Sequence, residues 1–146
     1  MPSTLTHLEC SRPGCGRTYD YSQRQNLCSA CNAPLLARYD LTKARRTFTR
    51  DALPGRVASM WRYEEVMPPG PAVTLGEGKT PLLHAPRLGG RLGLANLYIK
   101  DEGQNPTNSF KARGLAAAVT MAKRLGIDTI ALPTADRKST RLNSSH

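Results

Sequence analysis

The clearest hydrophobic pattern lies in the last third of the chain. An apolar run at residues 97–99 is followed, after a polar loop, by an alanine-rich stretch from 112 to 125. Apolar side chains recur there at three- and four-residue spacing: Leu115, Val119, Ala122 and Leu125. That spacing predicts a helix with one buried face, ended by Gly126. A second apolar run at 129–132 completes a strand–helix–strand pattern, which predicts a unit of an open parallel α/β sheet with ligands at the carboxyl ends of its strands.

Little regular pattern precedes this unit. Residues 38–41 indicate a short strand, and five prolines interrupt any long element between the cysteines and residue 81: Pro34, Pro54, Pro68, Pro69 and Pro71. We therefore interpret residues 1–40 as a small module, 41–80 as a linker, and 81–135 as the start of a larger domain. Within that domain, the glycines of residues 89–93 indicate a turn.

All four cysteines fall within the first 31 residues, in two short-spaced pairs: Cys10 and Cys15, then Cys28 and Cys31. Two such pairs around a hairpin-sized insert suit a tetrahedral four-cysteine zinc site, and Gly16 and Asn32 suit the left-handed turns that follow. Four thiolates fill the shell, so the predicted zinc is structural. Two disulfides or four free thiols are the alternatives, but disulfides suit an oxidising compartment, and the first residues have no apolar core of signal-peptide length.

A lysine occupies an unusual position within residues 105–114, between the predicted strand and helix. Lys111 falls in the first helical turn, where the partial positive charge of the helix dipole disfavours a cation and Asp or Glu is usual. A neutral amine is the form that attacks a carbonyl carbon to make an imine. A solvated surface lysine is the alternative that this position alone leaves open.

The residues around this lysine resemble the cofactor-lysine motif of threonine synthases and their fold-type II relatives, which use pyridoxal phosphate (PLP). The motif, Asn-Pro-Thr-Gly-Ser-Phe-Lys-Asp/Ala-Arg-Gly, matches residues 105–114, with Asn108 in place of the usual glycine. Asn is the next best residue for a left-handed backbone position. The resemblance extends to residues 75–83, 98–102 and 132–135. Ala112 replaces the Asp of many members, which leaves the subgroup open.

This resemblance implies that Lys111 is the Schiff-base lysine, that Phe110 lies against the PLP ring, and that Ser109 and Asn108 line the approach. The implied α/β fold is an N-terminal zinc ribbon followed by the beginning of a fold-type II open parallel sheet. The implied reaction converts O-phosphohomoserine and water to threonine and phosphate. A threonine or serine dehydratase, or another amino-acid β-replacement enzyme, is the alternative within that fold. A zinc-ribbon nucleic-acid-binding module is the alternative from another class.

Residues 136–146 lack apolar periodicity and resemble the product of one reading frame of a sequencing adapter. We expect a non-native tail there, preceded by the front part of an enzyme that is inactive by itself. Without the tail, 18 basic residues face 10 acidic ones, spread without interleaved aromatics, which suits a solvated surface better than a nucleic-acid site. No run near 20 apolar residues predicts a membrane span. We expect a cytoplasmic enzyme with a small amino-acid substrate, and a homo-oligomer stays open.

Overall fold

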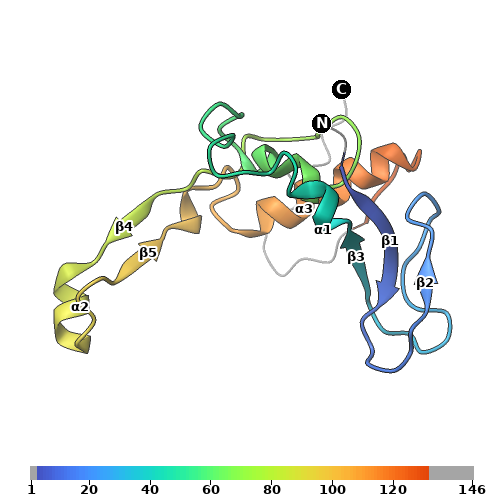
Figure 1. Ribbon diagram of the computed structural model, residues 1–146, viewed down its shortest axis with the longest axis horizontal. Helices are drawn as coiled ribbons and strands as arrows, with labels where there is room; N and C mark the ends of the chain where they lie inside the picture. Colours follow the sequence, from blue (N-terminus) through green and yellow to red (C-terminus); the bar gives the residue numbers. More distant parts are fainter. Residues whose placement is uncertain (1–2, 132–146) are drawn as a thin grey trace.

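A three-stranded antiparallel sheet forms the N-terminal part of the computed structural model, which describes residues 3–131 (Figure 1). Its strands are β1 (Leu5–Cys10), β2 (Thr18–Tyr19) and β3 (Leu35–Tyr39), in the order β2-β1-β3. The strand predicted at 38–41 is thus the end of β3. Asp40 stops it and caps the short helix α1 (Leu41–Ala44), because its carboxylate accepts the Lys43 N–H at 2.8 Å. The sheet places Cys10 at the end of its central strand.

The segment predicted as a linker contains a 3₁₀-helix, η1 (Met60–Val66), and a buried ion pair. The Glu65 side chain is 1% exposed and accepts two hydrogen bonds from Arg56, at 2.6 and 2.7 Å, and one from Thr47 at 2.8 Å. The Arg56 guanidinium holds the pKa of Glu65 down at about 2. The Glu65 carbonyl also accepts the Thr4 N–H at 2.8 Å. This backbone hydrogen bond fastens the segment to the residue before β1.

A second, two-stranded sheet carries a helix between its strands. Strand β4 (Leu82–His84) pairs antiparallel with β5 (Tyr98–Lys100), and α2 (Pro86–Leu92) connects them. Figure 1 shows this β4–α2–β5 arm extending away from the rest of the molecule. The turn predicted at 89–93 is wrong, since most of it is helical. Adjacent glycines disfavour a helix, but a Cβ on Gly89 would lie 2.3 Å from the Leu94 carbonyl oxygen, so the close return of the chain requires glycine there.

The predicted helix at 112–125 is confirmed as α3 (Lys111–Arg124), which follows β5 and the short 3₁₀-helix η2 (Glu102–Gln104). The parallel strand pair is not formed within residues 3–131. There, residues 129–131 lie outside any strand, and β5 pairs with β4 in the antiparallel sense. Parallel strands need neighbouring strands and helices over both faces, whereas within residues 3–131 the strand paired with β5 is β4 alone. The architecture is mixed α/β; residues 132–135 of the motif and the predicted tail at 136–146 lie outside the described part.

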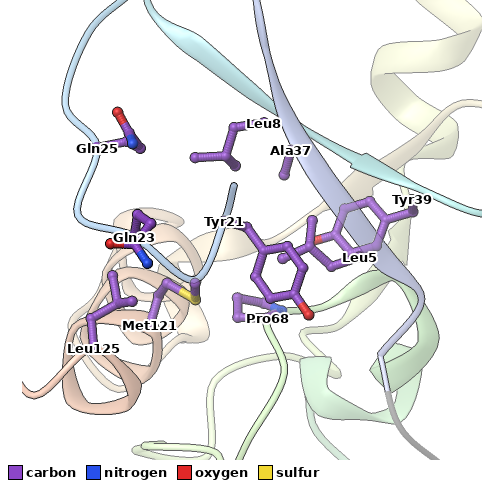
Figure 2. Close-up of a pocket in the computed structure, with 10 residues that line it drawn as sticks. All are labelled: Leu5, Leu8, Tyr21, Gln23, Gln25, Ala37, Tyr39, Pro68, Met121 and Leu125. Atoms are coloured by element: carbon purple, nitrogen blue, oxygen red, sulfur yellow. The ribbon is translucent and has the colours of Figure 1, made fainter. Parts of the chain in front are cut away.

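The C-terminal end of α3 packs against the N-terminal sheet. Figure 2 shows Met121 of this helix and Leu125, the residue after it, beside the loop that carries Tyr21 and Gln23. These residues, with side chains of β1 and β3, line a mainly apolar cavity of about 150 Å³. The Arg124 guanidinium also lies over the Tyr21 ring, 5.7 Å from its centroid. Within residues 3–131, no helix combines the length and the apolar character needed to cross a bilayer.

Candidate functional site

The structure brings the four predicted metal ligands together. The Sγ atoms of Cys10, Cys15, Cys28 and Cys31 all lie within 4.8 Å of one another, and no disulfide joins them. Three of the sulfur–sulfur distances are 3.4, 3.7 and 3.8 Å. A tetrahedral zinc ion with metal–sulfur bonds of about 2.3 Å holds its sulfurs about 3.8 Å apart. The donor set therefore fits a tetrahedral metal ion.

Tight turns place these sulfurs. After β1, the Arg12 N–H points back at the Cys10 sulfur, 3.4 Å away. Gly16 and Asn32 both adopt left-handed conformations, with φ of 64° and 54°, as the sequence predicts. The Asn32 N–H donates to the Cys28 carbonyl at 2.8 Å and closes the second turn. Each turn directs the sulfur atoms of its two cysteines toward the centre of the cluster.

A tyrosine that sequence reasoning missed also contacts the cluster. The Tyr19 hydroxyl donates to the Cys28 sulfur at 3.2 Å and lowers the pKa of this thiol to about 6. At Cys10 the Arg12 N–H lowers the pKa, but burial and the neighbouring thiols outweigh it and raise the pKa to about 12. Four crowded sulfurs cannot all ionise unaided, because their negative charges repel one another. A divalent cation would supply the missing charge.

The predicted cofactor residues form one exposed loop at the start of α3. Lys111 is the first residue of this helix, and its N–H donates to the Ser109 hydroxyl at 3.1 Å. Asn108 has a φ of 53°, the left-handed conformation expected where relatives carry glycine. Phe110 is 65% exposed, so its ring offers an open apolar surface beside the lysine. Within residues 3–131 the Lys111 ammonium forms no hydrogen bond or ion pair, which leaves it accessible to a ligand.

An ion pair holds this loop in place. Glu102 accepts two hydrogen bonds from the Arg113 guanidinium, at 2.7 and 2.8 Å, and one from Thr80 at 2.6 Å. The Arg113 charge keeps the pKa of Glu102 well below its ordinary value. Asn105 donates to Glu102 at 2.9 Å and accepts the Gly78 N–H at 3.1 Å. The two segments of the resembled motif, around Gly78 and around Lys111, are thereby joined.

A second buried carboxylate, that of Glu77, holds the segment that precedes Gly78. Glu77 accepts the Trp61 indole N–H and the Leu75 N–H, both at 2.8 Å. Burial raises the pKa of Glu77, but its hydrogen bonds outweigh this effect and lower it. The next residue must be glycine, because a Cβ on Gly78 would lie 2.4 Å from the Met60 nitrogen. The loop before β4 is therefore locked onto η1.

Glu77, Glu102 and Arg113 lie within the resembled segments, but no spacing in the sequence indicates their pairing. Glu102 and Arg113 lie 11 positions apart, which is not a helical ion-pair spacing. Glu77 and Trp61 are separated by 16 positions in a proline-rich segment. Their pairing becomes visible only once the chain has folded.

Comparison with known proteins finds a similarity that includes this loop. Residues 73–135 match the model of the pyridoxal-phosphate dependent enzyme family. The matched residues include Lys111 and its loop.

The particular resemblance is to threonine synthases. Threonine synthase of Methanosarcina acetivorans is 36% identical over 139 residues, which cover 94% of this chain and 33% of that protein. Threonine synthase of Methanocaldococcus jannaschii is 36% identical over 131 residues, 88% of this chain and 32% of that protein. Threonine synthase of Mycobacterium leprae is 44% identical over 85 residues.

The resemblance inferred from the sequence is thus confirmed, and the dehydratase and nucleic-acid alternatives are not favoured. The chain spans about a third of the length of the Methanosarcina acetivorans and Methanocaldococcus jannaschii relatives.

Proposed function

We propose that this chain is part of a PLP-dependent threonine synthase, which converts O-phosphohomoserine and water to threonine and phosphate. Similarity to threonine synthases over nearly the whole chain supports the proposal. The observation that carries it is the position of Lys111, which opens α3 on an exposed loop anchored to Gly78 through Asn105 and Glu102.

The loop residues fit the chemistry of the cofactor. Lys111 would hold PLP through its Nζ atom, Phe110 would pack against the ring, and Ser109 and Asn108 would line the approach. When bound, PLP supplies an electron sink for negative charge on the substrate α-carbon. The Nζ atom of Lys111, as a neutral amine, would carry protons to and from the substrate. The open surface of Phe110 and the unpaired ammonium support these roles.

The cysteine cluster has a different proposed role, as a structural zinc site. Four thiolates complete a tetrahedral shell and leave no position for a substrate. The sulfur spacing and the absence of disulfides among the described cysteines support zinc in a reducing compartment, so we place the protein in the cytoplasm.

Lys111 can be tested in the full-length protein by reducing it with borohydride in the presence of PLP. We expect mass spectrometry to find PLP fixed on Lys111, and Lys111→Ala to abolish turnover of O-phosphohomoserine. Lys123→Ala, at the other end of the same helix, serves as the matched control and should keep full activity. PLP on another lysine would contradict the assignment of Lys111.

The reaction is tested separately from the lysine. Threonine and phosphate should appear in equal amounts from O-phosphohomoserine. If the protein ignores that substrate and releases ammonia and a keto acid from threonine or serine, it is a dehydratase.

A further inference from the structure

The two short-spaced cysteine pairs approach each other crosswise. The Sγ atoms of Cys10 and Cys31 lie 3.4 Å apart, and those of Cys15 and Cys28 lie 3.7 Å apart. Each of these contacts joins cysteines of different pairs, and together they use every sulfur once. They therefore match one of the three connectivities that four cysteines allow, in which one disulfide is nested inside the other.

Backbone hydrogen bonds align the outer pair, Cys10 and Cys31, independently of the sulfurs. Cys10 lies opposite Leu35 in the ladder between β1 and β3, and the Ser11 N–H donates to the Pro34 carbonyl at 2.9 Å. The sheet thus keeps the end of β1 beside the turn that carries Cys31. An S–S bond is about 2.05 Å long, so the two sulfurs need only a small further approach to form one.

The inner pair is aligned through Tyr19. The Tyr19 hydroxyl donates to the Cys28 sulfur at 3.2 Å and accepts the Ser29 N–H at 2.9 Å. Tyr19 itself lies opposite Leu8 in the ladder between β1 and β2. Strand β2, which follows Cys15 closely, thus holds Cys28 within reach of that cysteine.

Exposure divides each of these two pairs in the same way. Cys10 is 5% exposed and Cys28 is fully buried, whereas Cys15 and Cys31 are half-buried. Each pair therefore combines one cysteine that a solute can reach with one that is closed to it. A small oxidant from solvent would react at the accessible sulfur, and the buried partner would then displace the oxidised group and form the disulfide.

We propose that the four cysteines are a modification site for hydrogen peroxide, which converts the cluster to two nested disulfides, Cys10 with Cys31 and Cys15 with Cys28. The inference rests on the proposed function of the cluster only for the metal ion that this oxidation would release. The nested disulfides join the same turns that the metal joins. The oxidised module therefore keeps the β2-β1-β3 sheet without metal.

Each disulfide consumes one peroxide molecule. The Cys31 thiolate attacks one peroxide oxygen, the O–O bond breaks, and hydroxide leaves while the sulfur becomes a sulfenic acid. The Cys10 thiolate then attacks the Cys31 sulfur, the S–O bond breaks, and a second hydroxide leaves. Each hydroxide takes up a proton, so two thiolates lose two electrons and two waters form. Cys15 and Cys28 repeat these steps with a second peroxide molecule.

Peroxide treatment of the zinc-loaded 146-residue chain tests the proposal. A chelating dye measures the zinc released, and fragmentation of the unreduced peptides in a mass spectrometer maps the disulfides. We expect loss of about one zinc per chain and the nested connectivity. The Ser11 amide should stay protected from hydrogen exchange in the oxidised, metal-free chain and lose this protection once a dithiol reduces it. A chain oxidised in denaturant is the control and should show no preference for the nested connectivity, because the fold no longer aligns the sulfurs.

The outcomes separate this modification from the metal. Any other connectivity in the folded chain, or sulfinic acids without disulfides, would overturn the proposal. So would loss of Ser11 protection on oxidation, because the disulfides would then not hold the sheet. A chain that carries no zinc yet forms the nested disulfides supports the modification site and removes the proposed zinc.

Discussion

Replacing one cysteine should unfold the whole N-terminal module. Within residues 3–39, the buried apolar side chains are Cys10 and Cys28, so hydrophobic burial contributes little to the stability of the β2-β1-β3 sheet. A structural four-thiolate zinc site contributes about 10–16 kcal/mol of apparent free energy in zinc-finger peptides, comparable to the whole 5–15 kcal/mol stability of a typical domain. Cys28→Ser removes one thiolate and the acceptor of the Tyr19 hydroxyl. The remaining contacts cannot replace that contribution.

Metal analysis and amide hydrogen exchange measure this effect. We expect about one zinc per chain in the wild type and none in Cys28→Ser. Protection should be lost at the Ser11 and Cys28 amides, which donate to Pro34 and Ala33 at 2.9 Å, and should persist in the middle of α3. Ser11→Ala, which changes a neighbour without touching the metal, should keep both zinc and protection.

The metal itself provides an independent check. Wild-type protein stripped of zinc by a chelator should show the same exchange pattern as Cys28→Ser, and adding zinc should restore protection in the wild type alone. If the stripped protein keeps its protected sheet, packing rather than metal holds the module, and the reasoning is wrong.

Three further changes test other parts of the structure. Glu65→Gln should lower the free energy of unfolding at pH 7 by about 3–5 kcal/mol, since it breaks a buried ion pair. Because the folded-state pKa of Glu65 is about 2, below its ordinary 4.5, this advantage of the wild type should be full above pH 5 and fade toward pH 2 in urea titrations. Gly78→Ala should cost about 3 kcal/mol or more in the same titrations, because its Cβ meets backbone at 2.4 Å, while Gly76→Ala, with open space around it, should cost only the backbone strain of about 1 kcal/mol. Tyr19→Phe should weaken zinc affinity about tenfold or more in competition with a chelating dye, while an unchanged affinity would remove Tyr19 from the site.

Periodic and short-range features were predictable from the sequence. The three- and four-residue spacing of Leu115, Val119 and Leu125 placed α3 to within one residue at each end. The cysteine spacing indicated a cluster that the structure forms, because each pair closes a local turn. The position of Lys111 at the start of a helix followed from the same pattern.

Features that depend on distant partners were not predictable. The segment around Glu65 and Glu77 looked like a featureless linker, because buried carboxylates are polar in any hydrophobicity pattern. Their burial depends on Arg56 and Trp61, which reach them only through turns of the chain. The apolar run after α3 satisfied the pattern of a strand, yet its described residues form none, since strand pairing requires a partner that a local pattern cannot supply.

Helix α3 is held at both of its ends, so a change in its tilt at one end moves the residue at the other end. Its 14 residues span about 21 Å, with Lys111 at one end and the contact between Arg124 and Tyr21 at the other. A tilt of about 5° about the far end would displace Lys111 by about 2 Å, and misplacement of about 1 Å can already cost a reaction two orders of magnitude in rate. Under the proposed role of Lys111, the contact between Arg124 and Tyr21 would help to fix the position of this lysine. Substitutions in the loop around Tyr21 would then lower the reaction rate by displacing Lys111, although they do not contact it.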